Sequence, residues 1–131
     1  MKMKILVFEP GKKPEVQTID HTLAAMQDVV KGDASYGMIA YIFPWDDPIA
    51  LVCHEKGKVL NMMPNRVLQN ENGDAYDVIF GPCFICGVNP DDNNFSSIPR
   101  RFIERFMDEK ECFKLFPAVE NFLEFMIGNL M

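Results

Sequence analysis

Two cysteines three positions apart are the first candidates for chemistry in this sequence. Cys83 and Cys86 have the Cys-x-x-Cys-Gly spacing that forms one half of a zinc knuckle. A tetrahedral zinc site takes four ligands, and the chain has no second pair with this spacing. The pair also lies within an apolar run typical of a β-strand, where residues three apart point to opposite faces. We therefore interpret both thiols as small side chains of a buried strand, keep them as weak metal candidates, and predict no cofactor.

The spacing of the other reactive side chains does not indicate nucleophilic catalysis. Cys53 and His54 are adjacent, so on a strand they point in opposite directions and cannot act as a nucleophile and its base. The carboxylates of Asp46 and Asp47 are flanked by prolines, which is the composition of a turn. The chain contains neither a Gly-x-Ser-x-Gly motif nor a glycine-rich phosphate loop. We predict no catalytic residue, and the sequence favours a protein that is not an enzyme.

An arginine that follows a Pro-Asn dipeptide is the most informative polar feature. Arg66 comes directly after Pro64 and Asn65, and a tight turn is predicted at residues 55–58. Its guanidinium could brace the loop by pairing with Glu55 and with backbone carbonyls, or it could present a fork to an anionic ligand. We favour bracing. The candidate binding residues for a ligand or partner are His54, Glu55, Asn65 and Arg66.

The elements that must position these residues follow from periodicity and turn chemistry. Residues 4–9 are apolar on both faces, which predicts a strand covered on both sides. Asp20 is the expected N-cap of a helix over 21–31 that Gly32 closes. Further strands are expected at 16–19, 35–43, 49–54, 59–60 and 77–88, and further helices from Pro99 and over 117–130. This order predicts an α+β fold, with a mostly antiparallel or mixed sheet of about five to six strands and two to three helices packed on it.

Composition restricts the class of protein. The chain has 131 residues, of which 48% are hydrophobic and 24% charged, and its net charge is −6. A single α+β domain over residues 1–131 with an ordinary buried core is expected. The negative charge disfavours binding to nucleic acid or to an anionic membrane.

Location and assembly are predicted from the two ends of the chain. The apolar run before Glu9 is too short for a signal peptide, and no apolar stretch is long enough to cross a membrane. We therefore expect a cytoplasmic protein. The predicted helix over 117–130 has an apolar face of roughly 200°, which is wide for a helix that covers only one core. It is a candidate add-on element through which the chain could form a homo-oligomer.

Three segments of the chain, residues 46–60, 63–68 and 76–87, resemble the DUF3846 family of small bacterial and phage proteins, which are common on gut prophages and integrative elements. The densest matches are Glu55-x-Gly57-Lys58 and Pro64-Asn65-Arg66, and the likeness extends over about residues 3–108. The resemblance implies no established activity and no catalytic residues. Relatives carry apolar or aromatic residues at the positions of Cys83 and Cys86, which favours the buried-strand interpretation.

We therefore predict a small cytoplasmic protein of mobile-element origin that acts as a non-enzymatic protein-binding or modulator domain. Its partner would be a host protein or one encoded by the element. The alternative is a small-molecule-binding protein or modest enzyme with a polar cleft near the four candidate residues.

Overall fold

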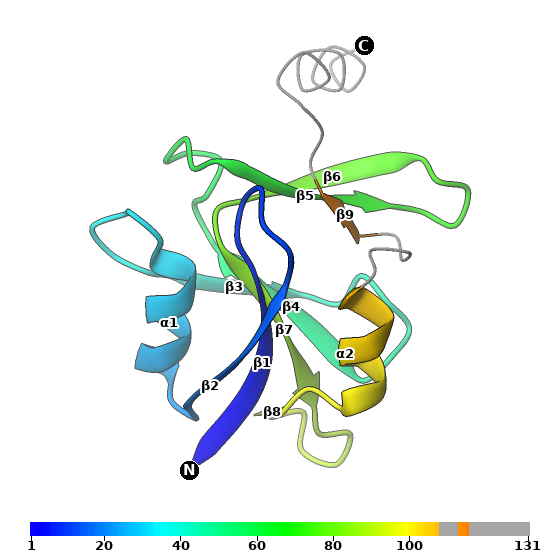
Figure 1. Ribbon diagram of the computed structural model, residues 1–131. Helices are drawn as coiled ribbons and strands as arrows, with labels where there is room; N and C mark the ends of the chain where they lie inside the picture. Colours follow the sequence, from blue (N-terminus) through cyan, green and yellow to red (C-terminus); the bar gives the residue numbers. More distant parts are fainter. Residues whose placement is uncertain (108–112, 116–131) are drawn as a thin grey trace.

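The computed structural model describes residues 1–107 and 113–115, which form an α+β fold (Figure 1). The elements in chain order are β1 (Lys2–Phe8), β2 (Glu15–Asp20), α1 (Leu23–Lys31), β3 (Ile39–Ile42), β4 (Ile49–His54), β5 (Pro64–Gln69), β6 (Ala75–Phe80), β7 (Cys83–Val88), β8 (Phe95–Ser96), α2 (Arg100–Met107) and β9 (Phe113–Leu115). Within this part of the chain, neither helix is long and apolar enough to cross a membrane. The helix expected over 117–130 lies outside the described residues.

The main sheet is antiparallel throughout and has six strands. Its order is β2-β1-β7-β4-β3, with β8 pairing beside β7. β1 lies between β2 and β7 in this sheet, and a packed core covers each of its faces, as its apolar residues predicted. Leu6 and Phe8 enter the core on one face, and Ile5 and Val7 enter the core on the other.

Helix α1 covers one face of the sheet through Met26 and Val30, which are buried against the strands. The expected helix is present, but its predicted N-cap was wrong. The Thr22 side chain accepts the N–H of Ala25 and caps the helix, whereas Asp20 belongs to β2 and pairs with Lys2. Asp20 is the last residue of the strand, where it is the register partner of Lys2 and their side chains form an ion pair. Gly32 ends the helix with a positive φ of 55°, a conformation that glycine adopts at little cost.

A second sheet, which the sequence did not predict, covers part of the other face. Its order is β6-β5-β9, again antiparallel. The short strand expected at residues 59–60 was wrong, because residues 55–61 form turns and β5 begins at Pro64. Proline is tolerated at the first position of a strand, where its missing N–H is not needed. Arg66 interrupts the apolar pattern of β5, so the sequence pattern did not predict this strand.

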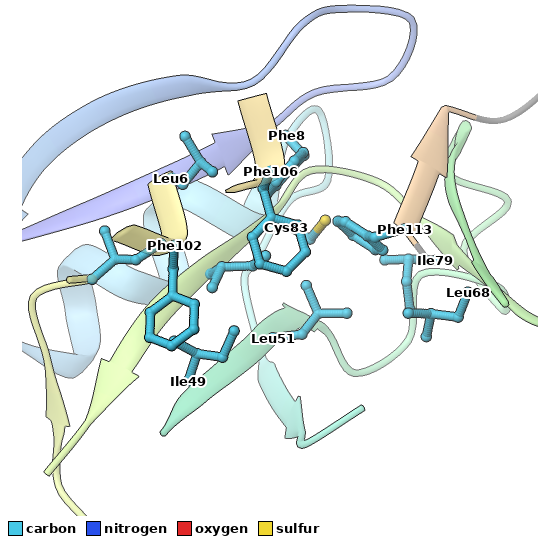
Figure 2. Close-up of a cluster of buried hydrophobic side chains, with 12 residues drawn as sticks. Leu6, Phe8, Ile49, Leu51, Leu68, Ile79, Cys83, Phe102, Phe106 and Phe113 are labelled. Atoms are coloured by element: carbon cyan, nitrogen blue, oxygen red, sulfur yellow. The ribbon is translucent and has the colours of Figure 1, made fainter. Parts of the chain in front are cut away.

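The larger core lies between the main sheet, α2 and the second sheet (Figures 1 and 2). Phe8 from β1 meets Phe113 from β9 edge to face, with ring centroids 4.9 Å apart. Trp45 packs against Phe106 of α2 at 4.8 Å and against Phe113 at 5.5 Å. These aromatic contacts join the two sheets and α2 into one packed unit.

Candidate functional site

Three of the four candidate site residues are buried. Asn65 and Arg66, at the start of β5, are 0% exposed, and His54, at the end of β4, is 4% exposed. Glu55 follows β4 and is exposed. Polar side chains are rarely buried unless their hydrogen bonds are made within the protein. Their partners therefore indicate what these residues do.

Asn65 ties three separate segments together. Its Nδ2 donates to the carbonyl of Phe8 at 2.7 Å and to that of Gly81 at 2.8 Å. Its Oδ1 accepts from Nη1 of Arg66 at 2.8 Å. A single buried amide thereby fixes the end of β1 and the turn between β6 and β7 relative to β5.

Arg66 reaches the hairpin between β1 and β2. Its Nη2 donates to the carbonyl of Lys12 at 2.6 Å, and Nη1 also contacts the carbonyl of Asn65 at 3.3 Å. The guanidinium lies 5.1 Å from the ring centre of Phe8, within the range of a cation–π interaction. These carbonyl contacts are of the kind that the bracing interpretation describes, and they hold the hairpin rather than the turn at Glu55.

His54 holds the loop that follows α1. The backbone N–H of Lys56 donates to Nδ1 at 3.0 Å, which makes Nδ1 the acceptor and leaves the proton on Nε2. Nε2 then donates to the carbonyl of Tyr36 at 3.1 Å. The Tyr36 and His54 rings also meet edge to face at 5.7 Å. The tautomer assigned by these bonds makes His54 a support for residue 36.

The loops held in this way line a cleft of about 500 Å³. Its lining residues are Glu9, Pro10, Lys12, Gly32, Asp33, Ala34, Ser35, Tyr36, Leu60, Asn61, Met62, Met63, Gly81 and Pro82. In Figure 1 the loop after α1 and the turn before β5 lie on the same side of the β1–β2 hairpin. None of the four candidate residues is among the lining residues. Asn65, Arg66 and His54 instead bond to the carbonyls of Gly81, Lys12 and Tyr36, three residues that do line it.

The lining is mixed in chemistry. Leu60, Met62 and Met63 supply an apolar side, and thioether side chains adapt to partners of different shape. Glu9 and Asp33 also line the cleft, and the ammonium of Lys12 lies 3.2 Å from the Glu9 carboxylate. Two carboxylates against one ammonium favour a neutral or positively charged guest. The sequence pattern did not indicate these residues as one site because they come from four segments that are far apart along the chain.

The cysteines have the environment of core side chains. Cys83 and Cys86 are fully buried in β7, and in residues 1–107 and 113–115 no group of three or more His, Cys, Asp or Glu side chains could hold a metal ion. Burial raises the pKa of the Cys86 thiol from 9.0 to about 12. Burial, and then the charge of Asp77, raises the pKa of Cys53 to about 11. Such thiols are poor nucleophiles because the reactive thiolate is disfavoured.

The raised pKa values predict a loss of stability in alkali. Below pH 9 the thiols are protonated in both the folded and the unfolded chain, so their contribution to stability is fully present. As pH rises from 9 toward the folded pKa of Cys86, which is about 12, the thiols ionise in the unfolded chain but stay protonated in the folded chain. The free energy of unfolding therefore falls by up to ~1.4 kcal/mol per pH unit for each thiol. Urea unfolding at pH 8 and pH 10.5 measures this slope. Cys86→Ala should have a shallower slope than the native chain, and equal slopes would contradict the assignment.

Comparison with known protein families identifies a match over most of the chain. The family model described as "Domain of unknown function (DUF3846)" matches residues 3–111. Neither a curated protein nor a solved structure matches the chain.

Proposed function

The chain belongs to the DUF3846 family, and from that membership and the geometry of the cleft we propose that it is a non-enzymatic protein-binding or modulator domain. The observation that carries this proposal is the apolar rim of a cleft whose walls are held by buried polar side chains. At this rim Met63 is 69% exposed, and Tyr36 and Leu60 are also exposed. Exposed apolar side chains grouped around a cavity are typical of surfaces that bind a partner.

The walls are held in place before any partner arrives. Asn65, Arg66 and His54 bond to backbone carbonyls, and none of the three is exposed enough to contact a large partner. A preformed surface loses less conformational entropy on binding. In this proposal the buried candidates act as positioning residues for the cleft, and exposed Glu55 is the one candidate that could touch a partner directly.

The charge of the cleft suggests what the partner presents. Glu9 and Asp33 line the same cleft as Met62 and Met63, and the chain as a whole carries −6. A large apolar side chain with a lysine or arginine close to it matches both features. The proposed partner is a host protein, or one encoded by a mobile element, with such a basic and apolar segment.

The wider setting is part of the same proposal. We place the chain as a single domain over residues 1–131 in the cytoplasm of a bacterium that carries a prophage or integrative element. The resemblance of residues 46–60, 63–68 and 76–87 to small proteins of such elements supports this setting. The apolar pattern of residues 117–130 supports a role for that segment in association.

A single substitution at the rim tests the proposed function. We expect Met63→Asp to reduce the recovery of the specific partner from a native-host lysate at least about tenfold, because a carboxylate in an apolar contact is costly. The matched control is Val59→Asp, since Val59 is 78% exposed but does not line the cleft. Quantitative mass spectrometry of proteins captured by the native chain and both variants measures the effect. Equal losses for both variants, or no loss for Met63→Asp, would refute the role of the cleft.

A second candidate function is supported by the size of the cavity. About 500 Å³ lies within the range of sites for small molecules, so the chain could be a small-molecule-binding protein or a modest enzyme that uses the same cleft. Native mass spectrometry of protein purified from its host distinguishes the two candidates. A bound small molecule that Met63→Asp releases would favour this second function over protein binding.

A further inference from the structure

The face of the main sheet that α1 covers also carries a groove lined by aromatic rings. Tyr41 of β3 is the register partner of Val52 in β4, and Val52 packs in the same core as Met26 and Val30 of α1. Residues directly opposite each other in an antiparallel pair share one face, so Tyr41 lies on the α1 face of the sheet. The groove has a volume of about 520 Å³ and is lined by Tyr41, Phe43, Val88, Asn93, Asn94 and Phe95.

The rings of this groove meet edge to face. The ring centroids of Tyr41 and Phe43 lie 5.8 Å apart with an angle of 74° between the planes, and those of Tyr41 and Phe95 lie 5.2 Å apart at 86°. An edge-to-face contact covers only one face of one of its two rings, and Tyr41 and Phe43 are 54% and 57% exposed. Ring faces are therefore open to solvent. Because the face of an aromatic ring is the negative end of its quadrupole, it attracts a cation.

Within residues 1–107 and 113–115, no cation of the protein covers these ring faces. The cation–π contacts found there belong to other rings: Arg66 lies 5.1 Å from the ring centre of Phe8, and Arg101 lies 4.5 Å from that of Phe102. Phe102 and the rest of α2 pack on the core at the opposite face of the main sheet. The groove is thus an aromatic surface without an arginine or lysine of its own.

The segments that form the groove are acidic. Neither lysine nor arginine occurs from Gly32 to Glu55 or from Val67 to Pro99, the two stretches that supply all of its lining residues. The loop before β8 also contains Asp91 and Asp92, both exposed, and the whole chain carries −6. Open ring faces in acidic surroundings are complementary to an organic cation.

We propose that this groove binds a small quaternary ammonium compound that carries a hydroxyl group, for which choline is the simplest probe. A primary ammonium is strongly hydrated and keeps its N–H donors in water, whereas a quaternary ammonium has no N–H to satisfy and binds well to aromatic faces. The neutral amides of Asn93 and Asn94 offer donors and acceptors to the hydroxyl. The volume of the groove lies within the range of small-molecule sites.

This site goes beyond the proposed function. It shares no lining residue with the cleft proposed for a protein partner, and it selects a ligand by its cationic charge and its hydroxyl rather than by a large apolar side chain. Loss of one binding activity therefore leaves the other unaffected, so each can be tested separately.

Titration of the whole ¹⁵N-labelled chain with choline, followed by NMR, tests the site. We expect saturable shifts that are largest for the amides of residues 41–43 and 93–95. The neutral compound 3,3-dimethylbutan-1-ol has the same shape but carbon in place of the ammonium nitrogen, and it should bind at least about tenfold more weakly because it lacks the attraction to the ring faces. Equal binding of the two compounds would overturn the proposal, as would shifts confined to the residues of the partner cleft.

Two substitutions at Phe43 separate the ring face from apolar size. Phe43→Leu keeps an apolar side chain but removes the ring, so the affinity for choline should fall at least about fivefold. Phe43→Tyr keeps the ring and should bind like the native chain. The control is Tyr76→Leu, because Tyr76 is 51% exposed on β6 but does not line the groove. A Phe43→Leu variant with native affinity, or an equal loss in Tyr76→Leu, would contradict the role of the rings.

A peptide that contains trimethyllysine tests the other source of the same cation. It presents the quaternary ammonium without the hydroxyl, so it should bind more weakly than choline. Binding of this peptide at least about tenfold tighter than that of choline would overturn the assignment to a small molecule, because it would identify a modified protein as the ligand.

Discussion

Replacing Asn65 with alanine is expected to lower the free energy of unfolding by about 3–5 kcal/mol. The side chain is fully buried and donates to the carbonyls of Phe8 and Gly81 while it accepts from Arg66. Its removal leaves two buried carbonyls without this donor and the guanidinium without this acceptor. Each lost partner costs about 1–3 kcal/mol when water cannot replace it.

Urea unfolding followed by circular dichroism measures this loss. Asn94→Ala is the matched control, because Asn94 is exposed in the loop before β8 and its truncation should change stability by less than about 0.5 kcal/mol. Asn65→Asp adds a sharper test, since the carboxylate is nearly the same size but presents an oxygen where the amide donated to two carbonyls. It should also be strongly destabilising. If Asn65→Ala were as stable as the Asn94→Ala control, the amide would not hold these segments.

The second large effect is expected at Phe113. This residue comes from β9 but is 2% exposed, with its ring 4.9 Å from Phe8 and 5.5 Å from Trp45. Figure 2 shows it among side chains of the main sheet and of the second sheet. Phe113→Ala should lower the free energy of unfolding by about 3–5 kcal/mol, because it removes an aromatic ring from a core that cannot fully close the gap.

Trp45 reports on this substitution directly. It is the only tryptophan of the chain and it packs against Phe106 and Phe113, so Phe113→Ala should shift its emission to longer wavelength as well as lower the urea midpoint. Met63→Ala is the control, because Met63 is exposed and lies outside this core. A stable Phe113→Ala variant with unchanged emission would show that β9 does not pack against the main sheet.

The outline of the main sheet could be predicted because its apolar pattern is local. Residues 4–9 predicted a strand covered on both faces, and both faces are covered. The helix ending at Gly32 was placed correctly at its C-terminus. Its N-cap was assigned to Asp20, whereas Thr22 caps the helix, because Asp20 pairs with Lys2 across the sheet and no local pattern encodes that contact.

The second sheet was not predicted because β5 does not show a simple strand pattern, although most of β6 lies within the strand expected at 77–88. β5 contains Pro64, Asn65 and Arg66, residues that in isolation indicate a turn. They occupy a strand because Phe8, Lys12 and Gly81, far away in the sequence, supply carbonyls that accept their hydrogen bonds. Their partners are separated from them by up to 57 positions, and no local pattern encodes such a contact.

By itself the sequence determined the fold class, the two-sided burial of β1 and the likeness to the DUF3846 family. It also identified Asn65 and Arg66 as candidate site residues. Only the tertiary structure decided what those residues do. Burial turned Asn65, Arg66 and His54 into supports for the walls of a cleft, and the cleft itself is lined by loops from four distant segments. The physical reason is that hydrophobic periodicity is a property of neighbours along the chain, whereas a cavity and its hydrogen-bonded frame depend on contacts between segments that only folding brings together.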